Sequence, residues 1–109
     1  MRKKRSRGSE YYQLVESQRV EGEPRQRVLV HLGRHATVDD ALHEWPKEIE
    51  RLRHFAHEAR TLGEISRESG ISDAWARENT RRAASAEKRA DEVEENLRKL
   101  RELRKRGVA

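Results

Sequence analysis

The sequence predicts an α+β fold, with an N-terminal β-hairpin followed by a mostly α-helical part. Two β-prone runs flank a Glu-Gly-Glu-Pro turn within residues 10–34, and helical periodicity dominates from residue 37 onward. The composition agrees, because only 33% of the 109 residues are hydrophobic and 41% are charged. Such a chain favours thin layers or paired helices over a deep enzyme cavity.

Residues 1–9 are predicted to form a flexible basic arm, because like charges repel and no apolar side chain anchors the segment. On a functional interpretation the arm neutralises phosphate groups and releases their counterions. The alternative is a solvated tail that only aids solubility. The side chains proposed to contact nucleic acid are Arg2, Lys3, Lys4 and Arg5.

Residues 10–34 are predicted to form the hairpin, with strands over 10–20 and 25–32. Residues 21–24 supply the turn, because Gly22 tolerates positive φ and Pro24 interrupts the pattern of the first strand. Alternation puts on one face Tyr12, Leu14, Val28, Val30 and Leu32. The opposite face carries further candidate nucleic-acid contacts, which are Tyr11, Arg19, Arg25, Arg27 and His31. An isolated hairpin is marginal in water, so its apolar face is expected to dock on the helices.

Residues 37–109 are predicted to be helical. Thr37 and Asp40 resemble a capping box that begins a short helix over 38–45, and Pro46 is expected to bend the chain before a second helix over 46–69. A long final helix over 73–106 follows. Its small and apolar residues step by three and four, which indicates a heptad seam, with possible self-association through residues 83–103. The cations at its end suit the helix dipole and would add non-specific affinity for nucleic acid.

Residues 61–82 allow two arrangements. They resemble the core of a helix-turn-helix, with Gly70 at the turn and Trp75 and Arg77 among the residues that face a major groove. The small side chains of Ala76 and Asn79 fit such a packed recognition helix poorly. The sequence therefore favours an antiparallel helical hairpin of 46–69 against 73–106, with the helix-turn-helix as the alternative.

No catalytic or metal-binding constellation is evident in the sequence. The histidines are scattered, and the pair His54 and His57 has no third ligand at zinc spacing. The sequence contains no cysteine, no nucleophile elbow and no glycine-rich phosphate loop. We therefore expect a protein that is not an enzyme and needs no cofactor or metal.

The charge balance points to a polyanion as partner. The chain has 25 Lys and Arg against 20 Asp and Glu, for a formal net charge of +5. An excess of this kind favours nucleic acid. No apolar run approaches the roughly 20 residues of a membrane span, and no secretory signal follows the basic start. The sequence therefore predicts a cytoplasmic protein without membrane contact.

The runs YYQLVES at 11–17 and RQRVLVHLG at 25–33 resemble the N-terminal segment of DDE-type insertion-sequence transposases. In that family a pattern close to YYxLVES…RQRVLxxLG precedes an RNase-H-like catalytic domain. The resemblance covers residues 10–34 and implies a prokaryotic source and a role near DNA, since the N-terminal regions of the family are associated with binding transposon ends. The catalytic domain, with its acidic residues and divalent metals, has no room in 109 residues, so no catalytic residue is carried over.

The predicted function is non-enzymatic binding of nucleic acid, with DNA favoured over RNA. Two alternatives stay open. One is a coiled-coil interaction or scaffold protein, whose heptad seam pairs within or between chains. The other is a truncated transposase remnant of no present function.

Overall fold

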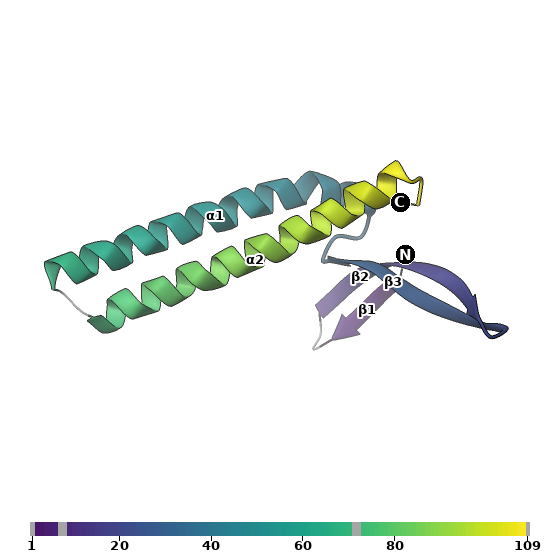
Figure 1. The fold of residues 1–109 in the computed structure, drawn as a ribbon, viewed down its shortest axis with the longest axis horizontal. Helices are drawn as coiled ribbons and strands as arrows, with labels where there is room; N and C mark the ends of the chain where they lie inside the picture. The colour runs from purple at the N-terminus through teal and green to yellow at the C-terminus, as the bar shows by residue number, and fades with distance from the viewer. Residues whose placement is uncertain (1, 7–8, 71–72, 109) are drawn as a thin grey trace. The chain divides into compact units, whose positions relative to one another are not determined.

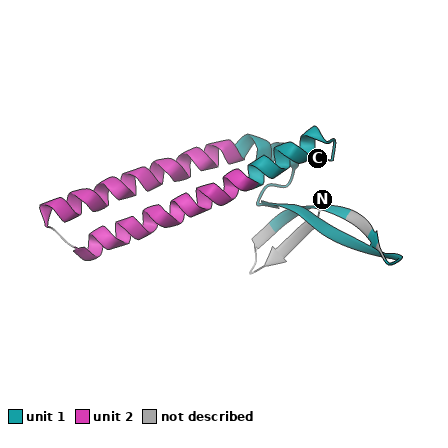
Figure 2. Cartoon of the chain, in the orientation of Figure 1, with its two compact units in different colours: residues 1–44, 96–109 teal, residues 45–95 magenta. Residues whose placement is uncertain are grey.

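The computed structural model describes residues 2–6, 9–70 and 73–108. Its elements are β1 (Arg2–Ser6), β2 (Ser9–Val20), β3 (Glu23–Gly33), α1 (Val38–Ser69) and α2 (Asp73–Lys105) (Figure 1). The predicted α+β class, with a β-hairpin ahead of two helices, is confirmed. The chain divides into two compact units (Figure 2): unit 1 comprises residues 1–44 and 96–109, and unit 2 comprises residues 45–95.

Unit 1 contains an antiparallel sheet in the order β1-β2-β3. Glu21 and Gly22 form the turn between β2 and β3 with φ values of 54° and 81°. Positive φ at both positions gives a turn whose twist matches that of the strands, and glycine adopts it without steric cost. Pro24 lies inside β3, where it is tolerated because β3 is an edge strand.

A strand is present where the sequence predicted a flexible arm. β1 pairs with the first part of β2, from Arg2 opposite Gln13 to Ser6 opposite Ser9. The prediction is wrong for Arg2–Ser6 because strand pairing uses backbone groups, and β2 offers them along the edge that β3 leaves open. Residues 7 and 8, which belong to the same predicted arm, lie outside the described residues.

The pairing of β2 with β3 contains two register shifts. Leu14 lies opposite Val30, but the next residue, Val15, lies opposite Val28, so the register skips Leu29. A bulge of this kind adds one residue to one strand and changes which side chains share a face beyond it. The strict alternation predicted for the hairpin therefore does not extend through the whole ladder.

Helix α1 begins as the sequence predicted. The backbone N–H of Asp40 donates to Oγ1 of Thr37 at 3.1 Å, and Asp39 and Asp40 lie in the first turn. A threonine cap satisfies one of the free N–H groups at the helix start, and the two carboxylates complement the positive end of the dipole.

The predicted break at Trp45 and Pro46, with separate helices over 38–45 and 46–69, is wrong. Pro46 lies inside the continuous helix α1. Proline removes one backbone hydrogen bond and crowds the preceding turn. Ala41 and Trp45, on the N-terminal side of Pro46, are both buried, and this burial opposes the tendency of the chain to leave the helix there.

In unit 2, α1 and α2 form an antiparallel helical hairpin (Figure 1). The buried residues of this hairpin are mostly small: Ala56, Ala59, Gly63 and Ser66 on α1, and Ala76, Asn79, Ala83, Ala86 and Ala90 on α2. A Cβ added at Gly63 would lie 3.3 Å from the carbonyl oxygen of Ala76, so the helices approach each other at backbone distance. The heptad seam of α2 thus pairs within the chain.

The alternative helix-turn-helix over 61–82 is not formed. Residues 61–69 continue α1 through Gly63, and Gly70, with a φ of 65°, follows its last turn. Contacts then run antiparallel, from Arg67 with Thr80 to Arg53 with Asp91. Residues 71 and 72, between the two helices, lie outside the described residues.

Candidate nucleic-acid interface

Positive charge is concentrated in unit 1. The sequence of unit 1 holds 15 Lys and Arg against 8 Asp and Glu, a formal net charge of +7. Unit 2 holds 10 against 12, a net charge of −2. Because salt screens charges beyond about 8–10 Å, a polyanion responds to such local excesses more than to the total. The charge of unit 1 therefore favours contact with a polyanion more than that of unit 2 does.

The C-terminal turns of α2 carry a dense group of cations in unit 1. Six exposed cationic side chains surround one acidic side chain, Glu102, and they are Arg98, Lys99, Arg101, Arg104, Lys105 and Arg106. Leu97 and Leu100 are buried on the remaining side of the helix. Cations at this position also complement the negative end of the helix dipole.

Backbone hydrogen bonds close the end of α2. Gly107 has a φ of 75°, and its N–H donates to the Arg104 carbonyl at 3.0 Å. The N–H of Val108 donates to the Leu103 carbonyl at 3.0 Å. This pair of bonds is a Schellman motif, which satisfies carbonyl groups that a helix end otherwise leaves open. The cations therefore project from a regular helix.

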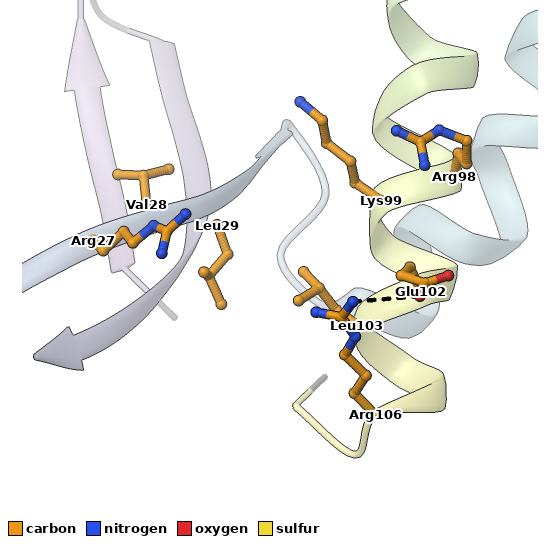
Figure 3. Close-up of a pocket in the computed structure, with 8 residues that line it drawn as sticks. All are labelled: Arg27, Val28, Leu29, Arg98, Lys99, Glu102, Leu103 and Arg106. Atoms are coloured by element: carbon orange, nitrogen blue, oxygen red, sulfur yellow. Dashed lines mark ion pairs between the residues drawn. The ribbon is translucent and has the colours of Figure 1, made fainter.

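A cleft of ≈ 400 Å³ in unit 1 lies between β3 and this part of α2. Figure 3 shows the side chains that line it, which are Arg27, Val28, Leu29, Arg98, Lys99, Glu102, Leu103 and Arg106. Four of them are cationic and one is acidic. Arg106 lies 3.6 Å from Glu102, so the single carboxylate is already paired. The cleft thus has the charge and the donor groups that a phosphate requires.

A second hollow, of ≈ 480 Å³, lies on another side of the α2 end. Leu42 of α1 lines it together with Arg101, Arg104 and Lys105 of α2. Nη1 of Arg104 lies 2.5 Å from a carboxylate oxygen of Asp39, so this cation ties α2 to the first turn of α1. Arg101 and Lys105 are exposed.

The hairpin arginines predicted to share one face do not do so. From Val15 to Val20 the register with β3 is unshifted, so residues directly opposite each other project from the same face. Arg19 lies opposite Pro24, whose neighbour Arg25 projects from the other face, together with Arg27. Strict alternation assumes that odd-numbered residues of the two strands share one face. The bulge at Leu29 reverses this relation between the bulge and the turn. The predicted face with Arg19, Arg25 and Arg27 is therefore wrong.

The face that carries Arg25 and Arg27 also has mixed charge. Arg27 lies opposite Glu16 on β2. Nη2 of Arg25 lies 3.7 Å from a carboxylate oxygen of Glu23. This half of the hairpin is thus less basic than the sequence pattern indicated. Arg27 also lines the cleft that β3 shares with α2.

The remaining sequence-predicted residues lie near the other end of the sheet. Nδ1 of His31 lies 3.1 Å from Nε2 of Gln13, its partner on β2. Tyr11 is half-buried and lies opposite Lys4 on β1. The backbones of Arg2, Lys3, Lys4 and Arg5 belong to β1, and the structure does not describe their side chains. That these residues bind nucleic acid stays a prediction.

In unit 2, by contrast, ion pairs join the two helices along one edge. Arg53 of α1 pairs with Asp91 and Glu94 of α2. Nη2 of Arg60 lies 2.5 Å from a carboxylate oxygen of Glu87. The hydrogen bonds that Arg53 donates to Glu94 and Asp91 raise the pKa of Arg53. These arginines join the two helices of the hairpin.

The same hairpin exposes large apolar side chains. The exposed fractions of Phe55, Leu62, Ile65 and Trp75 lie between 44% and 52%. Phe55 and Leu62 are seven residues apart, so they lie on one side of α1, away from the edge that Arg53 and Arg60 occupy. Unit 2 therefore offers apolar surface where unit 1 offers charge.

In the ranges 2–6, 9–70 and 73–108, no group of three His, Asp or Glu side chains is placed to hold a metal ion. Within the same ranges, neither helix combines the length and the apolar character that crossing a membrane requires.

Comparison with known protein families identifies the family to which the chain belongs. Residues 1–106 match a family model described as the N-terminal domain of IS1634 family transposases. The resemblance inferred from the hairpin is thus confirmed, and it extends over nearly the whole chain. Neither the curated proteins nor the solved structures contain a significant match.

Proposed function

We propose that this chain, which belongs to the IS1634 transposase family and spans its N-terminal domain, binds DNA without catalysing a reaction. The observation that carries the proposal is the cationic end of α2, with the cleft that it shares with Arg27 of β3. A transposase acts on DNA, so DNA is the polyanion that a basic surface in this domain is expected to meet.

The chemistry of the cleft suits a phosphate backbone. Arginine presents a planar set of donors that can hold a phosphate through two hydrogen bonds, and lysine adds a compact charge. Each phosphate that is neutralised releases condensed counterions, which makes binding favourable at low salt. Glu102 is paired with Arg106, so the lining supplies cations and not an acid and base pair.

The cations predicted from the N-terminal sequence are proposed as additional contacts. Arg2, Lys3, Lys4 and Arg5 follow one another along an edge strand, a position that a backbone phosphate can approach. Arg19, Arg25 and His31 are further candidates, although they do not form one continuous face with the cleft.

A fluorescence anisotropy titration with duplex DNA at several salt concentrations tests the proposal. The logarithm of the affinity should fall linearly with the logarithm of the salt concentration, by about 0.9 for each phosphate contacted. The double variant K99A/R106A should lower that slope by about 2. The matched control is R77A/K88A, which removes two exposed cations from unit 2 and should leave the slope unchanged. Absence of binding at low salt, or binding with no salt dependence, contradicts the proposal.

A second candidate function is protein–protein interaction through unit 2. The exposed side chains of Phe55, Leu62, Ile65 and Trp75 favour it. Self-association was predicted through residues 83–103, but Ala83 and Ala86 of that segment already pack against Ala56 and Ala59 of α1 in the same chain. Sedimentation velocity over a range of concentrations distinguishes the cases, since a mass that stays at one chain contradicts self-association.

A further inference from the structure

We infer that the C-terminal turns of α2 occupy the major groove of duplex DNA, with cations on two sides of the helix holding the two phosphate backbones that border the groove. The inference rests on the proposed function. It adds the form of the nucleic acid, the groove, and the element that enters it.

Helical geometry separates the cations of α2 into two rows. Successive residues of an α-helix are rotated by about 100°, so Lys99 and Arg106 project in nearly the same direction. Arg101 and Lys105 project roughly 130° away from them. The structure agrees, because Arg101 and Lys105 line the hollow beside Leu42, whereas Lys99 and Arg106 line the cleft beside β3 together with Arg98 and Glu102. We call the first pair the cleft row and the second pair the outer row.

The dimensions of the two partners match. An α-helix with its side chains is about 10–12 Å across, and the major groove is about 12 Å wide. Cations on two sides of a helix in this groove can therefore reach both backbones. The minor groove, at about 6 Å, is too narrow for a helix. A single strand has one backbone and would engage one row.

The side chains between the rows face the floor of the groove in this arrangement. Arg98 and Glu102 are four residues apart and lie on the same side of α2, between the cleft row and the outer row. Arginine can pair with the edge of guanine, and a carboxylate can accept a hydrogen bond from the amino group of cytosine. Glu102 would exchange its pairing with Arg106 for such a contact when Arg106 turns to a phosphate.

The helix end is also held in place well enough to present both rows. Leu97 and Leu100 are buried on the opposite side of α2, and Arg104 is bound to Asp39 of α1. Supporting contacts of this kind keep side chains at a fixed spacing, which contact with two backbones at once requires. Arg104 therefore acts as a positioning residue, and it is left intact in the test.

The test measures the salt slope for a duplex and for one of its single strands. The cleft-row variant K99A/R106A and the outer-row variant R101A/K105A should each lower the slope on the duplex by about 2, and the combined variant by about 4. On the single strand only one of the two double variants should lower it. Methyl green, a major-groove ligand, should displace the protein from the duplex, whereas netropsin, a minor-groove ligand, should not.

Two results overturn the inference and leave the proposed function standing. One is salt-dependent binding that the outer-row variant retains unchanged, because the protein then holds a single backbone. The other is displacement by netropsin and not by methyl green. A wild-type chain that shows no salt-dependent binding contradicts the proposed function itself. Circular dichroism of each variant, together with R101K/K105R, which keeps both charges and should restore the slope, separates lost contacts from lost structure.

Discussion

Unit 1 and unit 2 share two helices but use their residues in opposite ways. Unit 1 buries large side chains such as Leu32 and Leu100 and leaves its cations exposed. Unit 2 buries mainly alanines and a glycine, with Trp45 and Val93 as larger exceptions, and its arginines Arg53 and Arg60 are paired with carboxylates of the facing helix. Arginine therefore joins helices in both units, through Arg104 and Asp39 in unit 1, but cations outnumber carboxylates in the sequence of unit 1 alone. The net charge of the whole chain hides this difference, which appears when the charge of each unit is counted separately.

The largest expected effect comes from the large-residue core of unit 1. Leu100→Ala should lower the free energy of unfolding by about 2–5 kcal/mol, because it removes a fully buried side chain and leaves a cavity. Ala83→Gly, at an equally buried position of unit 2, should cost about 1 kcal/mol through helix propensity. Urea unfolding followed by far-ultraviolet circular dichroism measures both. Equal losses would remove the contrast between the two cores.

Unit 2 should be sensitive to a larger side chain at a buried position, because its helices are closely packed. Gly63→Leu should destabilise the protein by about 1–3 kcal/mol or more, since a side chain there meets the backbone of α2 at Ala76. The control is Leu62→Ala at the neighbouring exposed position, which should change stability by less than about 0.5 kcal/mol. The same urea series measures these variants. A Gly63→Leu protein as stable as the wild type would mean that the helices do not approach so closely.

The inter-helix ion pairs should contribute less, and their contribution should depend on salt. Glu87→Gln removes the partner of Arg60 and should cost about 0.2–1 kcal/mol at low salt, as expected for exposed pairs. The loss should shrink at about 1 M salt, where the Debye length is near 3 Å. Glu50→Gln, at an exposed position of α1, is the matched control. A loss that persists at high salt would indicate packing and not charge.

The smallest effect concerns the acid stability of unit 2. A hydrogen bond from Arg81 lowers the pKa of Glu78 below its usual value of 4.5. A depressed carboxyl pKa contributes stability above the unfolded value, and the contribution disappears as pH falls through the folded pKa. The stability difference between the wild type and Glu78→Gln should thus be constant near neutral pH and decrease below about pH 4.5. Thermal unfolding at pH 7, 5, 4 and 3 measures it. A difference that grows as the pH falls would give the shift the opposite sign.

The sequence predicted those parts of the fold that depend on local chemistry. The Thr37 cap, the glycine turn at Gly22 and the end of α2 at Gly107 each follow from what a single residue permits. The helical hairpin follows from periodicity. Pairing of β1 with β2 could not be predicted, since backbone groups carry it and the side chains of the segment are repulsive. Continuity of α1 through Pro46 depends on burial around it, which no local pattern records.

The candidate site was predicted less well, for a reason that lies in the sheet. Strict alternation placed Arg19 with Arg25 and Arg27, and the bulge at Leu29 separates them. The signal that was available is the density of cations in residues 98–106, around the buried residue Leu100. From the sequence alone, this cluster is expected both to complement the helix dipole and to add non-specific affinity for nucleic acid. The β2–β3 register and the cleft between β3 and α2 bring Arg27 into one candidate site with the cations of the helix end, and neither can be deduced from the sequence.

The skipped residue at Leu29 has a consequence for how this sheet can change over time. Deleting that one residue would remove the bulge, but the two-residue turn at Glu21 and Gly22 would still hold Arg19 opposite Pro24 and keep Arg25 and Arg27 on the other face. The deletion would therefore change the bend and twist of the hairpin and leave its charge pattern as it is. Relatives that differ in length at this point are expected to present the same two faces at a different angle.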